Sequence, residues 1–237
     1  MLLLGNDIVD LQEDGVAGKS ADRRFMTRVF TENEHQTILA SPQPDVMLWM
    51  LWAAKETAFK IVSKLGQPPV FAHKKFTVRL LAPHETAENR EIGVEVKYED
   101  IPARVTVSRQ SHYIYSLGHA ETKKPGWKHH VFSETQEVSE KDDLSENSGE
   151  VTFSRNELKN VTHRQSLQVR FYCKQALARR LAVHPSRLQI IRPRIANKSL
   201  PPYLLLDGRR CGIDISFTHH GRFLAWCGSV PRHCMPA

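Results

Sequence analysis

The sequence lacks the features that mark membrane, secreted and zinc-binding proteins. Across its 237 residues no apolar run approaches the ~20 residues that a membrane helix requires. Residues 1–4 are apolar, but Asn6 and Asp7 follow at once, so the start has neither the basic flank nor the length of a signal peptide. The four cysteines form no CxxC pair, which argues against a zinc site and favours reduced, mostly buried thiols. We therefore predict a cytoplasmic protein that does not enter a membrane.

Charge is unevenly distributed along the chain. Residues 133–150 hold seven acidic residues and one basic residue, a net charge of −6, whereas the whole chain carries +7. The remaining residues therefore carry +13, and such a surface favours a polyanion: nucleic acid, a phosphate-rich cofactor or an acidic protein. Hydrophobic residues make up 41% of the chain, which is typical of a globular protein rather than a disordered one.

The acidic stretch divides the chain. We predict a half over residues 1–130, an acidic linker or loop over residues 131–150, and a second half over residues 151–237. Each half has a helical pattern followed by strand-like runs. The helical patterns cover 46–65 and 166–182, and the strand-like runs cover 75–81, 93–98, 103–108, 113–118, 188–192, 203–206, 213–217 and 223–227. These predict an α+β fold of two pseudo-symmetric halves, each a small, mainly antiparallel sheet packed on a long helix.

A weak internal repeat relates the two halves. Residues 52–58 lie over 171–176, and residues 105–112 lie over 213–220. In this register Glu56 aligns with Gln175, and Ser111 aligns with His219. The acidic residue is therefore present only in the first half, and the histidine only in the second. Chance similarity is the other interpretation. If the repeat is real, we expect one active site at the interface of the two halves.

The candidate catalytic residues lie in the first half. Asp7 ends an apolar strand-like run, and Glu56 and Lys60 are one turn apart on the predicted helix. A strand carboxylate and a helix carboxylate can share a divalent cation, and Lys60 could reach an anion bound to that cation. The alternatives are a turn-capping Asp7 and a surface ion pair worth only ~0.3–0.5 kcal/mol. Asp10 could be a further ligand or a cap.

The candidate binding residues lie in the second half. Thr218, His219 and His220 fall in a predicted hairpin turn, where they could line a phosphate or adenosine site or could cap backbone groups. Lys198 stands before two prolines in a rigid turn that enters a strand. Basic residues are frequent here, and for most of them a solvated face is the simpler interpretation: Arg164, Arg170, Lys174, Arg179, Arg180, Arg192, Arg194 and Lys198.

Together these motifs resemble the 4'-phosphopantetheinyl transferases. The family's G-(I/V)-D-I segment is similar to residues 5–8, its W-x-x-K-E-(A/S)-x-x-K segment to residues 52–60, and its S-(I/L)-S-H-(S/T) segment to residues 216–220. The family's F-(S/T)-x-x-E stretch is similar to residues 25–34. The Asp/Glu half comes first, as in the short holo-acyl-carrier-protein synthases, but the chain has the length of the two-half enzymes. Asn6 replaces an aliphatic residue and Val9 replaces a third acid, so two carboxylates and waters would hold the metal.

The resemblance implies transfer of the 4'-phosphopantetheine arm of coenzyme A to a serine of an acyl or peptidyl carrier protein, with release of 3',5'-ADP. It implies that Asp7 and Glu56 bind Mg²⁺, that Glu56 takes the serine proton, and that Lys60 neutralises the pyrophosphate. It also implies that the coenzyme A nucleotide is held by Arg164, Lys198, Thr218 and His219. A monomer is expected. The alternatives are a basic nucleic-acid-binding protein, for which no recognition motif is present, and an inactive relative that binds coenzyme A.

Overall fold

The computed structural model describes residues 2–66, 72–81, 91–121, 129–139, 151–161, 163–195 and 198–235. The chain forms two compact units. The N-terminal unit is Gly5–Ala120, and the C-terminal unit is Met1–Leu4 together with Glu121–Ala237. Both combine helices with antiparallel strands, so the predicted α+β class is confirmed. Within the described ranges, no helix has both the length and the apolar character needed to cross a membrane.

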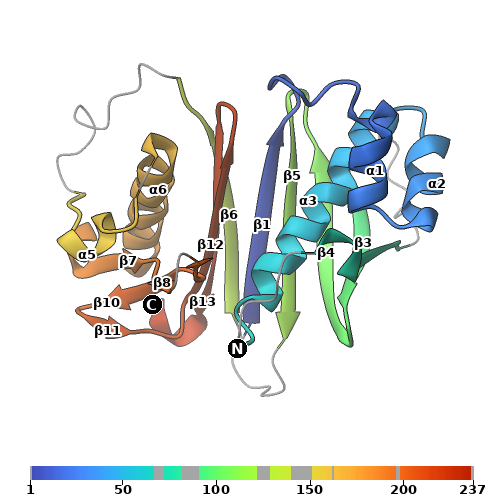
Figure 1. Ribbon diagram of the computed structural model, residues 1–237. Coiled ribbons are helices and arrows are strands. Elements are labelled where there is room, and N and C mark those ends of the chain that lie inside the picture. Colours follow the sequence, from blue (N-terminus) through green and yellow to red (C-terminus); the bar gives the residue numbers. More distant parts are fainter. Residues whose placement is uncertain are drawn as a thin grey trace. The chain divides into compact units, whose positions relative to one another are not determined.

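The N-terminal unit is built on a five-stranded sheet with the order β1-β5-β4-β3-β2. Its strands are β1 (Leu2–Asp10), β2 (Phe76–Leu80), β3 (Glu91–Tyr98), β4 (Ile101–Arg109) and β5 (Tyr113–Glu121). The predicted long helix is α3 (Pro44–Val62), which lies along one face of the sheet (Figure 1). Alternate residues of β4 are buried, because one face of this strand packs on the core: Ala103, Val105 and Val107.

Short helices precede and follow α3 in the sequence. They are η1 (Lys19–Ala21), α1 (Arg23–Val29), α2 (Glu32–Ala40) and η2 (His73–Lys75). The Asp22 side chain accepts a hydrogen bond from the Phe25 backbone and so begins α1. These helices place Phe25 in an aromatic cluster with Trp49 and Trp52 of α3.

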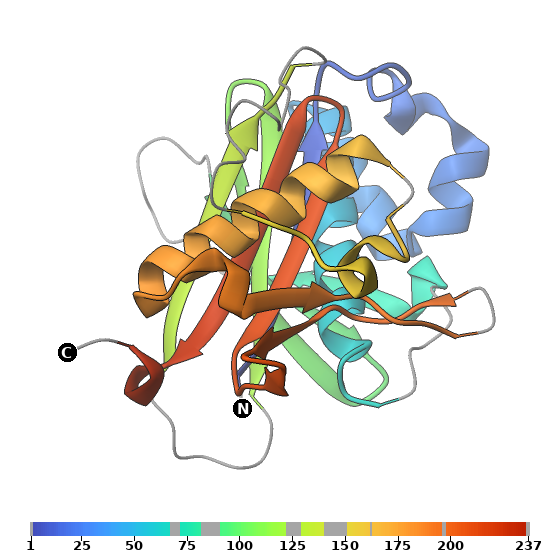
Figure 2. The same cartoon turned by 90° about the vertical axis from the view of Figure 1, so that its left-hand side faces the viewer.

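The C-terminal unit has a long helix and three small sheets, with strand orders β12-β13-β6, β11-β10-β7 and β8-β9. The strands are β6 (His129–Glu137), β7 (Leu188–Ile191), β8 (Arg194–Ile195), β9 (Lys198–Ser199), β10 (Tyr203–Leu206), β11 (Arg209–Arg210), β12 (Asp214–His220) and β13 (Phe223–Pro231). The helices are α5 (Arg155–Leu158), α6 (Arg164–Leu181), η3 (Pro185–Arg187) and η4 (Arg232–Cys234). In Figure 2 the orange α6 lies across the red strands β12 and β13.

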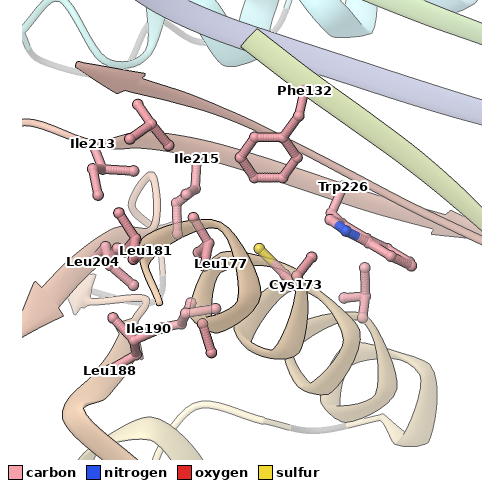
Figure 3. Packing of buried hydrophobic residues seen from close by; sticks show 14 of the residues in the cluster. Phe132, Cys173, Leu177, Leu181, Leu188, Ile190, Leu204, Ile213, Ile215 and Trp226 are labelled. Carbon is pink, nitrogen blue, oxygen red and sulfur yellow. The ribbon is translucent and has the colours of Figure 1, made fainter. Parts of the chain in front are cut away.

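The core of this unit lies between α6 and the strands. Leu177 and Leu181 of α6 face Leu204 of β10 and Ile215 of β12, and all four belong to one buried cluster (Figure 3). Helix α6 buries side chains around most of its circumference, polar ones included, and not only along a single apolar stripe.

The predicted linker is wrong in its first part. Residues 131–137 belong to β6, which pairs with β13 along its whole length, and Phe132 and Val138 are buried in the core. Strand β6 lies at the edge of its sheet, where polar side chains can face solvent. Its sequence is therefore as polar and acidic as that of an exposed loop, and the sequence pattern did not predict a strand. Glu134 makes ion pairs with Arg179 and Arg180 of α6. Residues 140–150 of the predicted linker lie outside the described residues.

A buried ion pair anchors α2 to α3 in the N-terminal unit. Thr31 and Glu34 form a capping box at the start of α2. Glu34 also accepts hydrogen bonds from the Lys55 ammonium at 2.8 Å and from the Val78 backbone at 2.7 Å. Lys55 is fully buried and lies 5.5 Å from the centre of the Phe30 ring. Lys55, one of the two lysines in the family-like motif, is therefore a structural residue.

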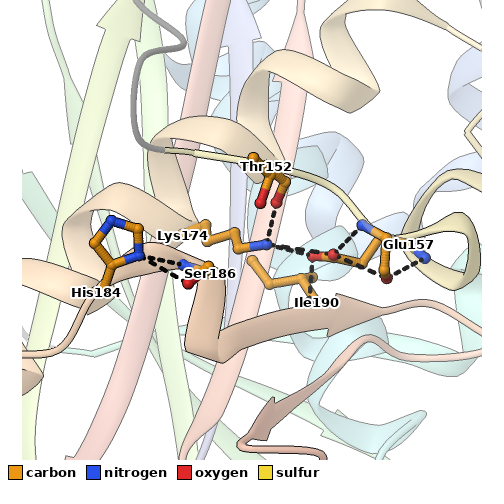
Figure 4. A network of polar contacts seen from close by, with 7 residues as sticks. Thr152, Glu157, Lys174, His184, Ser186 and Ile190 are labelled. Atoms are coloured by element: carbon orange, nitrogen blue, oxygen red, sulfur yellow. Dashed lines mark hydrogen bonds and ion pairs between the residues drawn. The ribbon is translucent and has the colours of Figure 1, made fainter.

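The C-terminal unit contains a matching network. Ser154 and Glu157 form a capping box at the start of α5. Glu157 accepts from the Lys174 ammonium at 3.1 Å and from the Ile190 backbone at 2.9 Å, as Figure 4 shows. Lys174 is buried and lies 5.1 Å from the centre of the Phe153 ring. Lys55 and Lys174 are the two lysines that the proposed repeat aligns, so the two networks support an internal repeat.

The strand part of the proposed repeat falls on an antiparallel hairpin in each unit. Val105 pairs with Gly118 in the β4–β5 hairpin, and Ile215 pairs with Gly228 in the β12–β13 hairpin. If Gly118 and Gly228 are taken as equivalent, Val105 aligns with Ile215, whereas the sequence repeat aligns Val105 with Ile213. The register of the repeat stays a prediction. A shift of two residues keeps every side chain on the same face of its strand, so the sequence pattern could not distinguish the two registers.

Candidate active site

Asp7 and Lys60 form an ion pair in the N-terminal unit. The Lys60 ammonium lies 2.9 Å from Asp7 Oδ1 and donates to the Asn6 carbonyl at 2.7 Å. The Lys60 side chain remains 25% exposed, while that of Asp7 is 10% exposed. In contrast to the buried Lys55, Lys60 can therefore still reach a bound anion.

Glu56 lies one helical turn before Lys60 and belongs to the same charge cluster. Burial raises the pKa of the Glu56 carboxyl to about 7, the negative charge of Asp7 adds to this increase, and the positive charge of Lys60 opposes it. Asp7 and Glu56 are therefore close enough to repel each other. Two partly buried carboxylates in this arrangement are oxygen ligands whose repulsion a divalent cation would relieve.

Two glycines allow α3 to approach the sheet closely enough to form this cluster. A Cβ atom at Gly5 of β1 would lie 2.3 Å from the Thr57 carbonyl oxygen, and one at Gly118 of β5 would lie 2.8 Å from Thr57 Cγ2. Only a glycine fits these contacts without displacing the helix. Asp7, two residues after Gly5, points to the same side of β1 and therefore towards α3.

Sequence reasoning missed a pair of buried hydroxyls beside this cluster. Thr57 Oγ1 lies 2.6 Å from Ser116 Oγ, and Ser116 Oγ also donates to the Ala53 carbonyl at 3.0 Å. Both side chains are fully buried and join α3 to β5. The available signal was Ser116 itself, a polar residue in an otherwise apolar strand-like run.

Asp10 caps a backbone N–H group, which is one of the two roles that the sequence left open for it. Its side chain is almost fully buried, and Oδ1 accepts a hydrogen bond from the Gln12 backbone at 3.0 Å. Within the described residues, no group of three or more His, Cys, Asp or Glu side chains could hold a metal ion. Any cation held by Asp7 and Glu56 would therefore need further ligands from water or substrate.

The predicted nucleotide-binding residues all lie in the C-terminal unit. Arg164 is the exposed first residue of α6, while Thr218 and His219 lie near the end of β12. The Gln165 side chain donates to the Gly221 carbonyl, so the start of α6 lies beside the β12–β13 turn. Lys198 is exposed on β9. One shared site between the two halves stays a prediction.

Residues 3–114 match the family model of the 4'-phosphopantetheinyl transferase superfamily. Over these residues the resemblance is confirmed. The matched segment contains Asp7, Glu56 and Lys60, and it supports phosphopantetheinyl transfer as the general activity. It ends before the four predicted nucleotide-binding residues.

The other two comparisons, with solved structures and with curated proteins, carry less information about this chain than the family model. The crystal structure of Thermotoga maritima holo-[acyl-carrier-protein] synthase (AcpS) is similar with a TM-score of 0.37 and 16% sequence identity, over 66% of this chain and 80% of that chain. No curated protein matches this chain in sequence.

Proposed function

We propose that this protein transfers the 4'-phosphopantetheine arm of coenzyme A to a serine of an acyl or peptidyl carrier protein in an Mg²⁺-dependent reaction that releases 3',5'-ADP. The observation that carries this proposal is the cluster of Asp7, Glu56 and Lys60 inside the segment that matches the superfamily.

Asp7 and Glu56 are the residues that would hold Mg²⁺. Their fit rests on the structure of the cluster. Both supply carboxylate oxygens, Asp7 is buried and Glu56 is partly buried, and their mutual repulsion contributes to the raised pKa of Glu56. When bound, the cation would polarise and neutralise the pyrophosphate of coenzyme A.

Glu56 is also suited to accept a proton. A general base works best with a pKa near the working pH, and the Glu56 pKa of about 7 meets that condition. In the proposed step the carrier serine loses its proton to Glu56, or to a water that Glu56 orients. The serine oxygen forms a bond to the phosphorus atom as the bond to 3',5'-ADP breaks, and Lys60 offsets the charge on the leaving group.

Arg164, Lys198, Thr218 and His219 are proposed to bind the nucleotide end of coenzyme A. The contact between Gln165 and Gly221 supports grouping Arg164 with the hairpin that carries Thr218 and His219. Lys198 has less support and would need to approach from β9. We also propose that both halves of one monomer complete the site, and that the net charge of +7 speeds encounter with acidic carrier proteins.

The test is an intact-mass measurement on an apo acyl carrier protein incubated with this protein, coenzyme A and Mg²⁺. We expect a mass gain of ~340 Da, the size of one phosphopantetheine arm, that is lost in EDTA. Asp7→Ala and Glu56→Gln should lower the rate by about 100-fold or more, whereas the exposed Asp100→Asn control should not.

Two outcomes would contradict the proposal. Full activity of Asp7→Ala and Glu56→Gln would remove the metal assignment. Binding of coenzyme A without transfer to several unrelated carriers would instead indicate an inactive relative.

A further inference from the structure

Arg170 of α6 is a charged residue in the interior of the C-terminal unit. Its side chain is 1% exposed, its Nη1 donates to the backbone carbonyl and hydroxyl of Ser166, and its guanidinium lies 5.1 Å from the centre of the Phe217 ring. Its Nε is buried and has no hydrogen-bond partner among the described residues. The general expectation of a solvated basic face is therefore wrong for this arginine.

Arg192, directly after β7, is a second arginine in this region. It is half-buried, and its Nε is also buried without a partner in the described part of the chain. Burial lowers the pKa of Arg170 to about 10, and the positive charge of Arg192 contributes to the decrease. The two guanidinium groups are thus within electrostatic range, and both remain protonated at neutral pH.

Within the described residues, the two charges are compensated only in part. No ion pair joins either guanidinium to a carboxylate there. The charge of Glu157 acts on Arg170, but its oxygens are already taken by Lys174, Ser154 and Ile190. Cys173 also lies within range, yet burial raises the pKa of its thiol so far that it stays uncharged.

Two like charges without a directly paired carboxylate are unfavourable in a protein interior. A buried charge is normally paired, and an arginine does not escape the penalty by losing its proton. Guanidinium N–H groups match the geometry of phosphate oxygens, which can accept from two donors at once. We propose that Arg170 and Arg192 together bind a phosphate group, which enters from the side of the partly exposed Arg192.

The phosphate group could come from two sources. Phe217, which contacts Arg170, directly precedes the two β12 residues proposed to bind the nucleotide of coenzyme A, so a nucleotide phosphate is one source. Free inorganic phosphate is the other. The site itself does not depend on the transferase proposal, because it rests only on two arginines whose buried Nε atoms have no partner among the described residues.

The test compares thermal unfolding in inorganic phosphate and in chloride at equal ionic strength. The variants are Arg170→Met and Arg192→Met, with Arg194→Met on the exposed β8 as the matched control. We expect phosphate at about a hundred times its Kd to raise the Tm of the natural protein and the control by roughly 5–10 °C more than that of the two variants. In chloride, Arg170→Met should unfold no earlier than the natural protein, because it removes a buried charge without a directly paired carboxylate.

Equal gains in phosphate for the natural protein and both variants would overturn the proposal. If Arg170→Met does not fold, the partly exposed Arg192→Met decides the result. Calorimetric titration of 3',5'-ADP with and without phosphate then identifies the source: competition indicates the nucleotide phosphate, and independent binding indicates a free anion. If the natural protein does not modify a carrier protein but phosphate still raises its Tm more than that of the two variants, the transferase proposal is rejected and the phosphate site stands.

Discussion

Thr57 Oγ1 of α3 and Ser116 Oγ of β5 lie 2.6 Å apart, and both side chains are completely buried. Thr57 directly follows Glu56, so the hydroxyl pair fixes the helical turn that carries the proposed base. The close approach of α3 to Gly5 and Gly118 at the same level adds to this constraint. The pair therefore holds Glu56 and Lys60 at their present depth over Asp7.

Removing the Thr57 hydroxyl should lower both stability and turnover. Thr57→Val leaves the buried Ser116 hydroxyl with one partner fewer, at a cost of about 1–3 kcal/mol. A displaced helix should lower kcat by roughly tenfold, with a smaller change in the KM for coenzyme A. Thr57→Ser, which keeps the hydroxyl, should retain most of kcat. Steady-state kinetics would contradict the idea if both variants lost turnover equally.

The raised pKa of Glu56 predicts a pH dependence of stability in the absence of divalent cations. Because the folded pKa of about 7 exceeds the ordinary value of 4.5, the folded protein binds the proton more tightly than the unfolded chain. This contribution is fully present below pH 4.5 and is lost as the pH rises through 7, by about 2–3 kcal/mol. Urea unfolding from pH 4.5 to 8 should show the slope.

The Glu56→Gln variant supplies the control for this slope. Glutamine does not titrate, so the difference between the two proteins isolates Glu56. Mg²⁺ should raise the Tm of the natural protein above pH 7 and have little effect on the variant. Parallel pH profiles for the two proteins would contradict the assignment.

The two buried lysine–glutamate pairs should each be essential to their own unit. Lys55→Met or Lys174→Met leaves a buried carboxylate without its counter-charge, and such losses cost about 3–5 kcal/mol. The exposed pair of Arg79 and Glu95 offers the contrast, because Arg79→Ala should cost under about 1 kcal/mol. Chemical denaturation measures all three, and small effects at both lysines would disprove the structural role.

Replacing Asn6 should stabilise the protein. Its side chain is completely buried, and neither polar atom has a partner among the described residues. Asn6→Val removes the unsatisfied groups and suits a strand, so a gain of about 1–3 kcal/mol is expected. The Lys60 contact uses the Asn6 backbone carbonyl, so it should survive the change. A lower Tm for Asn6→Val would show that the amide is satisfied in solution.

Local patterns were sufficient for much of the fold. The helical spacing of apolar residues predicted α3 and α6, and short strand-like runs of residues predicted most of the strands. Both patterns can be recognised because they involve residues that are close together in the sequence. The edge strand β6 was missed, because its composition is polar and its pairing with the distant β13 leaves no local trace. The strand register of the repeat stays a prediction, since a shift of two residues leaves the same side chains on each face of a strand.

The sequence by itself determined the chemistry available to this protein. It indicated Asp7, Glu56 and Lys60 as candidate site residues, because a strand end and a helical spacing can be recognised from residues close together in the sequence. Tertiary structure alone decided which groups are buried and with which partners. In the folded protein Lys55 is buried in an ion pair, whereas Lys60 remains accessible. Thr57 contacts Ser116, and Arg170 is buried within electrostatic range of Arg192. Burial and partner choice depend on contacts between residues far apart in the chain, and those contacts set the cost of each charge.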